Sequence, residues 1–594
     1  MNGLIGGTLS ESTAIDALVE TDAAADSEPV VRSRGEFTLC VSHLTDRDAT
    51  GWGVHDADGI TGVRYGAIPG IRGSDEEEAS FFRGLLEDPA ETLARADGPF
   101  AVACTDGEEL VVASDKLGTR PIQYADGDDP GEDLVFGSNL AEVAATLDRP
   151  SVDERAVSDL LLIGHVWGEK TLLDQVTYLS PATVLRYDGA ETDRQEYWAP
   201  TFDTRPRTSF GQNVASAYRS CLGDAASTMD DASVSMWLSG GLDSRAMVGE
   251  LAERFPDMRT FTYDANPSGG GNLRIARDVA DTLGIANETV DLTPGPLVEH
   301  FEDAVTLTDG MLGWKTFLNL TASFAVEDPG DVLLEACGQG GMMGDGIGRA
   351  AIELSSSPAD ALYRAKHKVD AETVETLLSG DADPMITYQQ AVDGVDQDGY
   401  AETVLGAYYR NYFPRGDFAS NKLVRARTGT RVPLAHGEFL DAVTKMPLKC
   451  RVGWVPGTRG AVPYGTAAAK LGLVRRLDSA LDSIPYERTK VAPERPLWQH
   501  AAGFVFHTGI RRLRGETTYG GRRMASAWSI TNDDLRTLLV GLLEDAADRP
   551  FLDADAVETV VEEHFETEAA DRIGAVSGIA TLEQWLQSHY DPHT

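Results

Sequence analysis

Residues 233–255 read SVSMWLSGGLDSRAMVGELAERF, and this stretch decides the fold. An apolar run typical of a buried β-strand (233–238) leads through two glycines into an amphipathic stretch with helical periodicity (244–255). Such a turn leaves backbone N–H groups unobstructed at a helix N-terminus, where the helix dipole favours a phosphate. The pattern therefore predicts a phosphate-binding loop at residues 239–244.

The side chains of this loop suit a phosphate that carries a metal ion. Ser239 and Ser244 add hydroxyl donors, and Gly240 and Gly241 allow close approach of the backbone. Asp243 would repel bare phosphate, but it is a suitable ligand for Mg²⁺ that bridges phosphates. The loop lacks the Gly-Lys-Ser/Thr ending of the Walker A pattern, which argues against ordinary γ-phosphate transfer. A plain left-handed turn with a helix cap is the alternative interpretation.

The rest of the chain divides into two kinds of pattern. Residues 1 to about 200 consist of short alternating segments broken by Gly and Asp, which predicts an antiparallel sheet architecture with few helices. After about residue 205, strands alternate with helices, which predicts a parallel sheet covered by helices, and from about 350 the chain is mostly helical. We predict strands at 37–44, 100–106, 109–115, 133–139, 259–264, 288–292 and 331–337, helices at 152–164 and 272–284, and acidic loops at 20–36, 72–79 and 125–133.

Charge and composition exclude several classes of protein. The chain has 95 acidic and 51 basic residues, and its formal net charge of −44 repels nucleic acid and anionic membranes. A hydrophobic content of 42% argues against disorder, and only 10 of the basic residues are Lys, which is typical of a halophilic protein. An ordinary acidic mesophilic enzyme is the alternative. Five scattered cysteines and the lack of a signal peptide or a long apolar run predict a cytoplasmic protein.

Several motifs occur in the order found in the asparagine synthase family, whose members split ATP into AMP and pyrophosphate. The loop SGGLDS (239–244) resembles the family's pyrophosphatase loop, and SIPYERTK (483–490) resembles its Pro-x-x-x-Arg-x-Lys segment. In the N-terminal half, DKLGTRPIQY (115–124) and residues 152–185 resemble its amidotransferase domain. The resemblance implies an α/β protein with an N-terminal αββα amidotransferase-like (Ntn-type) sandwich at 1–200. An adenine-nucleotide α-hydrolase-like parallel-sheet domain with a helical C-terminal part would follow at 205–594.

The resemblance also implies ATP and Mg²⁺ as cofactors and assigns roles to individual residues. Lys490 would be the catalytic residue, stabilising charge on the α-phosphate and on the tetrahedral intermediate. Asp243 would bind the metal ion, and Asp345 is either a second metal ligand or a turn residue. The expected binding residues for ATP and pyrophosphate are Leu238, Ser239, Gly240, Gly241, Asp243, Ser244, Arg245, Thr262 and Gly338.

Two departures from the family concern glutamine hydrolysis. The family's glutaminase uses a cysteine directly after the initiator Met, and MNGLIGG keeps this frame with Asn2 in the cysteine's place. An amide cannot attack a glutamine carboxamide as a thiolate does. The family's Asn-Gly-Glu segment is also not recognisable between 51 and 75. We therefore expect the N-terminal domain to be a structural cap without glutaminase activity.

Further departures concern the synthetase half. The family's Ser-Gly-Glu-Gly-x-Asp-Glu loop reads CGQGGMMGD at 337–345, so Met342 and Met343 replace its acidic pair. Gly429 stands where the family has Glu, and we expect the following His436 to be a helix cap or a surface residue.

Three hypotheses for function follow from these patterns. The first is an amide-forming ligase that activates a carboxylate as its acyl-adenylate for attack by ammonia or an amine, with aspartate and ammonia as the family default. The second is a non-catalytic family member that binds nucleotide and acts as a partner or regulatory protein. For the chain as such, a homodimer is one expected assembly. The third is a working glutamine-dependent synthetase, which Asn2 argues against.

Overall fold

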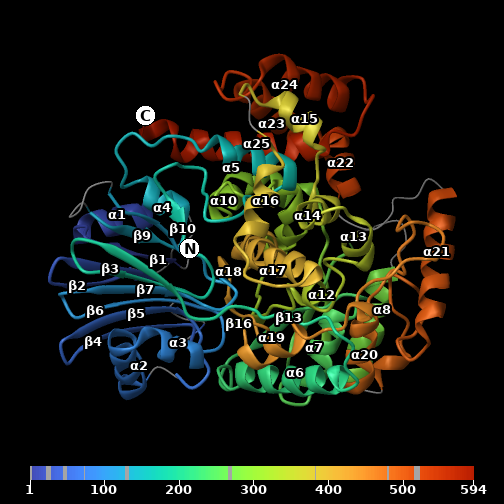
Figure 1. Ribbon diagram of the computed structural model, residues 1–594, viewed down its shortest axis with the longest axis horizontal. Helices are drawn as coiled ribbons and strands as arrows, with labels where there is room; N and C mark the ends of the chain where they lie inside the picture. Colours follow the sequence, from blue (N-terminus) through green and yellow to red (C-terminus); the bar gives the residue numbers. More distant parts are fainter. Residues whose placement is uncertain are drawn as a thin grey trace.

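The computed structural model describes residues 3–21, 29–43, 48, 50–71, 74–127, 133–264, 271–380, 383–477, 480–513 and 522–593. Two antiparallel sheets form the N-terminal unit, and a parallel sheet with many helices forms the C-terminal unit beside it (Figure 1). Met1 and Asn2 lie outside the described residues, so the departure at Asn2 stays a statement about sequence.

Each N-terminal sheet has six strands, and all of its pairings are antiparallel. In sheet order, the first consists of β10 (Thr177–Tyr178), β8 (Gln123–Ala125), β9 (Val135–Gly137), β1 (Gly3–Gly7), β3 (Phe37–Ser42) and β2 (Val30–Arg34). The second consists of β12 (Thr192–Glu196), β11 (Thr183–Tyr187), β7 (Leu110–Ser114), β6 (Phe100–Thr105), β5 (Ile60–Gly66) and β4 (Trp52–Ala57).

The two sheets pack face to face, and helices cover their outer faces. Fully buried apolar side chains from both sheets, among them Leu39, Val63 and Phe136, share one core. Helix α1 (Glu11–Thr21) packs on β1 and β3 and also contacts α4 (Leu140–Ala144). On the other side, α2 (Asp75–Glu87) packs on β4, β5 and β6, next to α3 (Pro89–Arg95). The predicted αββα sandwich is confirmed.

The C-terminal unit is built on a five-stranded sheet in which every pairing is parallel. Its order is β15 (Ala286–Thr289), β14 (Arg259–Thr262), β13 (Val234–Trp237), β16 (Val332–Leu334) and β17 (Gly429–Arg431). Helix α7 (Asp243–Leu251) packs on β13, α8 (Gly271–Leu283) packs on β14 and β15, and α6 (Phe210–Ala226) packs on α7. The predicted α/β domain with a parallel sheet is therefore confirmed.

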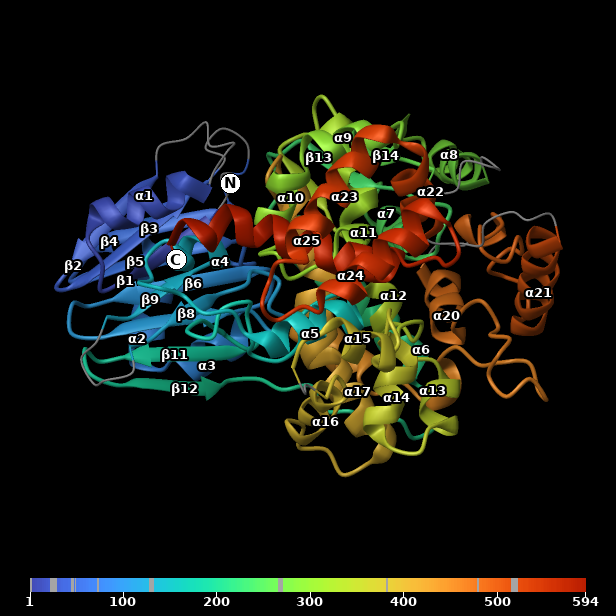
Figure 2. The ribbon, with the colours of Figure 1, turned by 90° about the horizontal axis from the view of Figure 1, so that it is seen from above.

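The remainder of the chain is helical, as predicted. Helix α5 (Glu154–Ile163) packs against α25 (Ile573–His589), and Figure 2 shows α21 (Leu497–Leu513) on the side opposite to the N-terminal sheets. The other helices are α9 (Pro294–Glu299), α10 (Phe301–Leu307), α11 (Trp314–Phe317), α12 (Gln339–Met342), α13 (Arg349–Leu354), α14 (Pro358–Lys366), α15 (Ala371–Leu377), α16 (Ile386–Asp393), α17 (Tyr400–Tyr412), α18 (Lys422–Arg425), α19 (Gly437–Val443), α20 (Ala468–Leu477), α22 (Arg522–Thr531), α23 (Asp533–Ala546) and α24 (Ala554–Val561).

Several local predictions were wrong. Of the stretch predicted as a loop at 72–79, residues 72 and 73 lie outside the described residues, and 75–79 form the start of helix α2. The side chain of Ser74 accepts a hydrogen bond from the N–H of Glu77, and acidic residues fill the first turn. The stretch at 20–36 contains strand β2, and the strand predicted at 288–292 begins earlier, at Ala286. In each case the secondary structure is set by a strand partner or a helix cap, and the local composition alone did not predict it.

Two further points concern the whole chain. Among the described residues, no helix combines the length and the apolar character needed to cross a bilayer. The segment between β12 and α6 contains the domain boundary predicted at 200–205, and this boundary stays a prediction.

Candidate nucleotide-binding site

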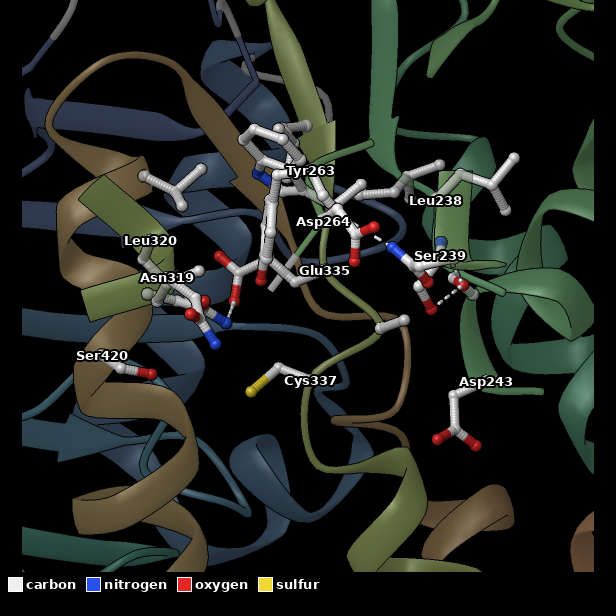
Figure 3. A pocket seen from close by; sticks show the side chains of 18 of the residues that line it. Leu238, Ser239, Asp243, Tyr263, Asp264, Asn319, Leu320, Glu335, Cys337 and Ser420 are labelled. Atoms are coloured by element: carbon white, nitrogen blue, oxygen red, sulfur yellow. Dashed lines mark hydrogen bonds between the residues drawn. The ribbon is translucent and has the colours of Figure 1, made fainter. Parts of the chain in front are cut away.

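A cavity of about 440 Å³ opens at the carboxyl ends of β13, β14 and β16. This is the edge at which parallel α/β sheets bind ligands, because the loops that follow neighbouring strands meet there. The lining residues are Trp237, Leu238, Ser239, Asp243, Ser244, Tyr263, Asp264, Asn272, Thr316, Asn319, Leu320, Leu333, Leu334, Glu335, Ala336, Cys337, Ser420, Asn421, Val424 and Glu487. Figure 3 shows Ser239 and Asp243 on one side of this cavity and Asn319, Glu335 and Ser420 on the other.

The glycine-rich loop joins β13 to α7 at one end of the cavity. The N–H of Ser239 donates to Oγ of Ser244 (3.1 Å), and the N–H of Gly241 donates to Oγ of Ser239 (3.2 Å). A Cβ atom on Gly240 would lie 2.8 Å from Cβ of Glu487, so a larger residue would collide there. Helix α7 begins at Asp243 without a side-chain cap on its first N–H groups, which are therefore suited to an anionic ligand.

Asp243 and Asp345 both form an ion pair with Lys470, a residue that the sequence analysis did not single out. Nζ of Lys470, on α20, lies 2.7 Å from Oδ2 of Asp243 and 2.8 Å from Oδ2 of Asp345. Burial raises the pKa of Asp243, and the nearby Lys470 partly offsets this effect. Burial alone would lower the pKa of Lys470, but the two carboxylates raise it well above its ordinary value. An internal ammonium group therefore bridges the two expected metal ligands.

The two carboxylates differ in their capacity to bind Mg²⁺. Both oxygens of Asp345 are engaged, since Oδ1 accepts a hydrogen bond from the N–H of Ala467 (3.1 Å) and Oδ2 contacts Lys470. Oδ1 of Asp243 is buried and has no hydrogen-bond partner among the described residues. Among those residues no group of three or more His, Cys, Asp or Glu side chains is arranged to hold a metal ion. The donor set fits one ion shared between Asp243 and phosphate oxygens, and it does not fit an ion bound by Asp345.

Of the three residues expected to contact the nucleoside, only Leu238 lines the cavity. The hydroxyl of Thr262 donates to the carbonyl of Leu238 (2.7 Å) and accepts from Asn287, within the sheet. Gly338 starts α12 with a φ of 78°, and a Cβ atom there would meet Phe418. Neither Thr262 nor Gly338 is among the described lining residues, and the residues that line this part of the cavity are Trp237, Tyr263, Asp264, Ala336 and Cys337.

Arg245 turns away from the phosphate loop. Its side chain is fully buried, and the guanidinium donates to the carbonyls of Leu481, Ile484 and Pro485. It therefore holds the segment that leads to Lys490, and it is not among the described lining residues. This placement gives Arg245 a positioning contact in place of the expected contact with phosphate.

Lys490 lies next to the loop without lining the cavity. Its segment is anchored to the loop, because the N–H of Glu487 donates to the carbonyl of Gly240 (3.0 Å). Nζ of Lys490 lies 2.8 Å from the position that a Cβ atom on Gly271 would take, at the start of α8. Asn272, the next residue in α8, accepts the N–H of Gly240 (2.7 Å). Lys490, α8 and the phosphate loop are thus neighbours.

Sequence reasoning also missed the polar end of the cavity. Glu335 follows β16 and is only 4% exposed. Its Oε1 contacts Nε of Arg425 (3.2 Å), and its Oε2 accepts from Nδ2 of Asn421 (2.7 Å) and from Nη2 of Arg425 (3.3 Å). The stretch DVLLEAC (331–337) could have indicated this site, because an acid at the carboxyl end of an otherwise apolar strand requires a partner when it is buried.

The other residues that depart from the family pattern lie outside the lining of the cavity. Met342 and Met343 are buried in the main hydrophobic core. His436 precedes α19, and its Nε2 lies 2.9 Å from Oδ2 of Asp224, away from the cavity. Gly429, in β17, has the carboxylate of Asp48 from the N-terminal unit beside it.

Two families match successive parts of the chain. Residues 83–198 match the glutamine amidotransferase domain family, and residues 217–335 match the asparagine synthase family. Asparagine synthetase [glutamine-hydrolyzing] 1 of Bacillus subtilis (strain 168) is 24% identical over 239 residues, which are 38% of this chain and 35% of that protein. Asparagine synthetase [glutamine-hydrolyzing] 3 of the same strain is 24% identical over 422 residues, which are 64% of this chain and 66% of that protein.

These matches are partial. The chain thus spans about a third and just under two thirds of the lengths of these two relatives. Among solved structures, the glutamine phosphoribosylpyrophosphate amidotransferase from B. subtilis complexed with ADP and GMP aligns with 49% of this chain and 80% of its own. The two chains are 12% identical, and the TM-score is 0.23.

Proposed function

The chain is a member of the asparagine synthase family, and from this membership we propose that it is an ATP-dependent ligase that forms an amide bond. It would activate a carboxylate as an acyl-adenylate with release of pyrophosphate, and ammonia or an amine would then attack the activated carboxyl. The observation that carries the proposal is the SGGLDS loop between β13 and α7, which opens onto the cavity beside Asp243 and Lys470.

The phosphate end of the cavity has the groups that the first step requires. The N–H groups at the start of α7, which the N-cap residue Leu242 does not cap with its side chain, and the hydroxyls of Ser239 and Ser244 would hold the pyrophosphate portion of ATP. Asp243 would hold Mg²⁺, which neutralises phosphate charge when it is bound. Lys470 would then exchange its contact with Asp243 for a phosphate oxygen while keeping Asp345.

Lys490 is proposed for the second step. Its position beside Gly271 and the loop puts an ammonium group near the phosphate end, from a segment that Arg245 holds in place. A lysine there would stabilise negative charge on the α-phosphate and on the tetrahedral intermediate. Catalysis would rest on orientation of the two substrates and on such charge stabilisation, because adenylation supplies the driving force.

The N-terminal unit would not hydrolyse glutamine. Asn2 replaces the family's nucleophilic cysteine, and an amide side chain cannot form the required thioester. The nitrogen would then come from free ammonia or from an amine substrate. We propose that the unit supports the synthetase site through contacts such as that of the Thr119 carbonyl with Arg425 (2.8 Å), which in turn holds Glu335.

A second candidate is a non-catalytic protein that binds nucleotide and regulates a partner. Two observations favour it: Met342 and Met343 replace an acidic pair, and both oxygens of Asp345 are already occupied by Lys470 and Ala467. For either candidate we propose a cytoplasmic protein of a halophile that binds neither nucleic acid nor membranes, because its net charge is −44.

Exchange of labelled pyrophosphate into ATP, measured at high salt over a panel of carboxylates, separates the two candidates. The ligase predicts exchange that depends on a carboxylate and that falls by about 10²-fold or more in Asp243→Ala. A folded protein that binds ATP but catalyses no exchange with any carboxylate would support the regulatory candidate. Release of glutamate from glutamine would overturn the proposal for the N-terminal unit.

A further inference from the structure

The lining of the cavity is unbalanced in charge. Among the described residues that line it, four are acidic and none is Lys, Arg or His. The four acids are Asp243, Asp264, Glu335 and Glu487. A ligand that enters this cavity therefore meets carboxylates first, and any cation that helps to bind it must come from behind the lining.

The two ends of the cavity differ in the cations behind them. At the phosphate end, Lys470 lies 2.7 Å from Asp243, and Lys490 lies beside the start of α8. At the other end the cation is Arg425, whose Nε and Nη2 contact Glu335 and whose Nη1 donates to the carbonyl of Thr119. All three donor nitrogens of Arg425 are thus committed within the protein. A ligand carboxylate at this end would face Glu335, and none of the described lining residues offers it a cation.

One neutral side chain at this end offers an unused acceptor. Oδ1 of Asn319 is buried and has no hydrogen-bond partner among the described residues. Nδ2 of Asn421 already donates a hydrogen bond to Oε2 of Glu335 (2.7 Å). Figure 3 shows the side chains of Asn319, Glu335 and Ser420 gathered on this side of the cavity. An unpartnered acceptor next to a carboxylate suits an N–H group, and best a charged one, because charge-assisted hydrogen bonds are the stronger.

We propose that this end of the cavity binds an ammonium group, so that the carboxylate substrate is an amino acid with a single carboxyl group. Glu335 is then the residue that determines specificity, and Asn319 is a second contact for the ammonium. A dicarboxylate such as aspartate would keep a second carboxylate that has to be desolvated beside Glu335 with no cation to pair it. The inference rests on the proposed ligase function, whose carboxylate it specifies.

The test compares γ-aminobutyrate and β-alanine with aspartate and succinate in two assays at the same high salt. Carboxylate-dependent pyrophosphate exchange gives kcat/KM for each, and calorimetry gives binding without turnover. We expect the amino monocarboxylates to be preferred by about tenfold or more over the dicarboxylates, the ratio that a single unpaired buried charge produces. A preference for aspartate or succinate in the wild-type protein overturns the inference.

Two variants locate the specificity. Glu335→Gln removes the acid and frees Arg425 for a ligand carboxylate, so the preference should fall by about tenfold or reverse. Asn319→Ala leaves the Glu335–Arg425 pair intact and should raise KM for γ-aminobutyrate with a smaller effect on kcat. Glu487→Gln, the same change at the phosphate end, should leave the ratio between substrate classes unchanged. Equal ratios in wild type, Glu335→Gln and Asn319→Ala overturn the assignment of Glu335.

The two assays keep this inference separate from the ligase proposal. If no carboxylate supports exchange although ATP binds, the ligase proposal fails, and calorimetry still decides the inference. Binding of γ-aminobutyrate but not of succinate then supports it. Binding of succinate as tight as that of γ-aminobutyrate, or no binding of either, overturns it.

Discussion

The carboxylate of Asp48 occupies the space that a side chain at Gly429 would need: a Cβ atom built on Gly429 would lie 2.2 Å from Oδ2 of Asp48. The same carboxylate binds Arg431, two residues further along β17, with Oδ2 2.7 Å from Nη1 and Oδ1 2.7 Å from Nη2. A residue of the N-terminal unit thus supplies a carboxylate to the last strand of the parallel sheet, at the position where the sequence lacks an expected Glu. The N-terminal unit is therefore part of the structure of the synthetase sheet.

Removal of this carboxylate should destabilise the whole chain. The side chain of Arg431 is only 1% exposed, so Asp48→Ala leaves a buried guanidinium without its partner and should cost about 3–5 kcal/mol in the free energy of unfolding. Chemical denaturation measures this cost. Asp56→Ala, which breaks an exposed ion pair with Arg34, is the control and should cost about 1 kcal/mol or less. Equal costs for the two variants would show that Asp48 contributes no more than a surface charge.

Gly429 should tolerate a side chain only when Asp48 is shortened. Gly429→Ala places a methyl group against the Asp48 carboxylate and should destabilise the protein by about 1–3 kcal/mol. The Cβ of Asp48 also lies 2.5 Å from this position, so only Asp48→Gly, which removes that atom, makes room, and in this background most of the cost should disappear. A double-mutant cycle of unfolding free energies gives this coupling, which we expect to exceed about 1 kcal/mol. Additive effects would contradict the close contact.

Lys470 should compete with divalent cations for Asp243. Lys470→Met leaves Asp243 and Asp345 together without a cation, so Mn²⁺ in the absence of nucleotide should bind about tenfold or more tightly than to wild type. Paramagnetic resonance or calorimetry measures this affinity. Affinity for pyrophosphate should fall in the same variant, because the ammonium group is lost.

A control for this experiment is Lys449→Met, since Lys449 is exposed and lies in another part of the fold. It should leave the affinities for Mn²⁺ and pyrophosphate unchanged. Weaker Mn²⁺ binding in Lys470→Met would mean that the ammonium group helps to hold the metal site open, contrary to the prediction.

Glu142 should make stability depend on pH. Burial raises its pKa from 4.5 to about 8, with partial offset by Lys422, although its Oε2 accepts the N–H groups of Ser138 and Asn139. Because the folded pKa is the higher one, the contribution of Glu142 to stability is complete below pH 4.5 and is lost as pH rises towards 8. Between these values the unfolding free energy should fall by about 1.4 kcal/mol per pH unit from this group alone.

The matched variant for Glu142 is Glu142→Gln, whose amide oxygen still accepts both N–H groups but does not titrate. Denaturation at several pH values should give a flatter pH profile than that of wild type. The same slope in both proteins would show that Glu142 does not titrate in this range.

Local patterns in the sequence predicted the elements that build the end of the cavity at the glycine-rich loop. The strand, glycine turn and helix at 233–255 are contiguous, so the position of Ser239, Gly240 and Asp243 follows from one stretch of chain. Strand β17 was not predicted, because GTR at 429–431 has no apolar run and is a strand only through its pairing with β16. The contacts of Arg245 could not be predicted either, because its hydrogen-bond acceptors are backbone carbonyls of a distant segment, 481–485.

The sequence by itself determined the class of the fold, the glycine-rich loop between strand and helix and the carboxylates that are missing, because strand and helix periods and a glycine turn act over neighbouring residues. Only the tertiary structure decided what surrounds that loop. Lys470 reaches Asp243 and Asp345 across more than a hundred residues, as do the contacts of Asp48 with Arg431. Such pairs leave no local pattern, because desolvation of buried charges selects their partners only when distant segments are packed together.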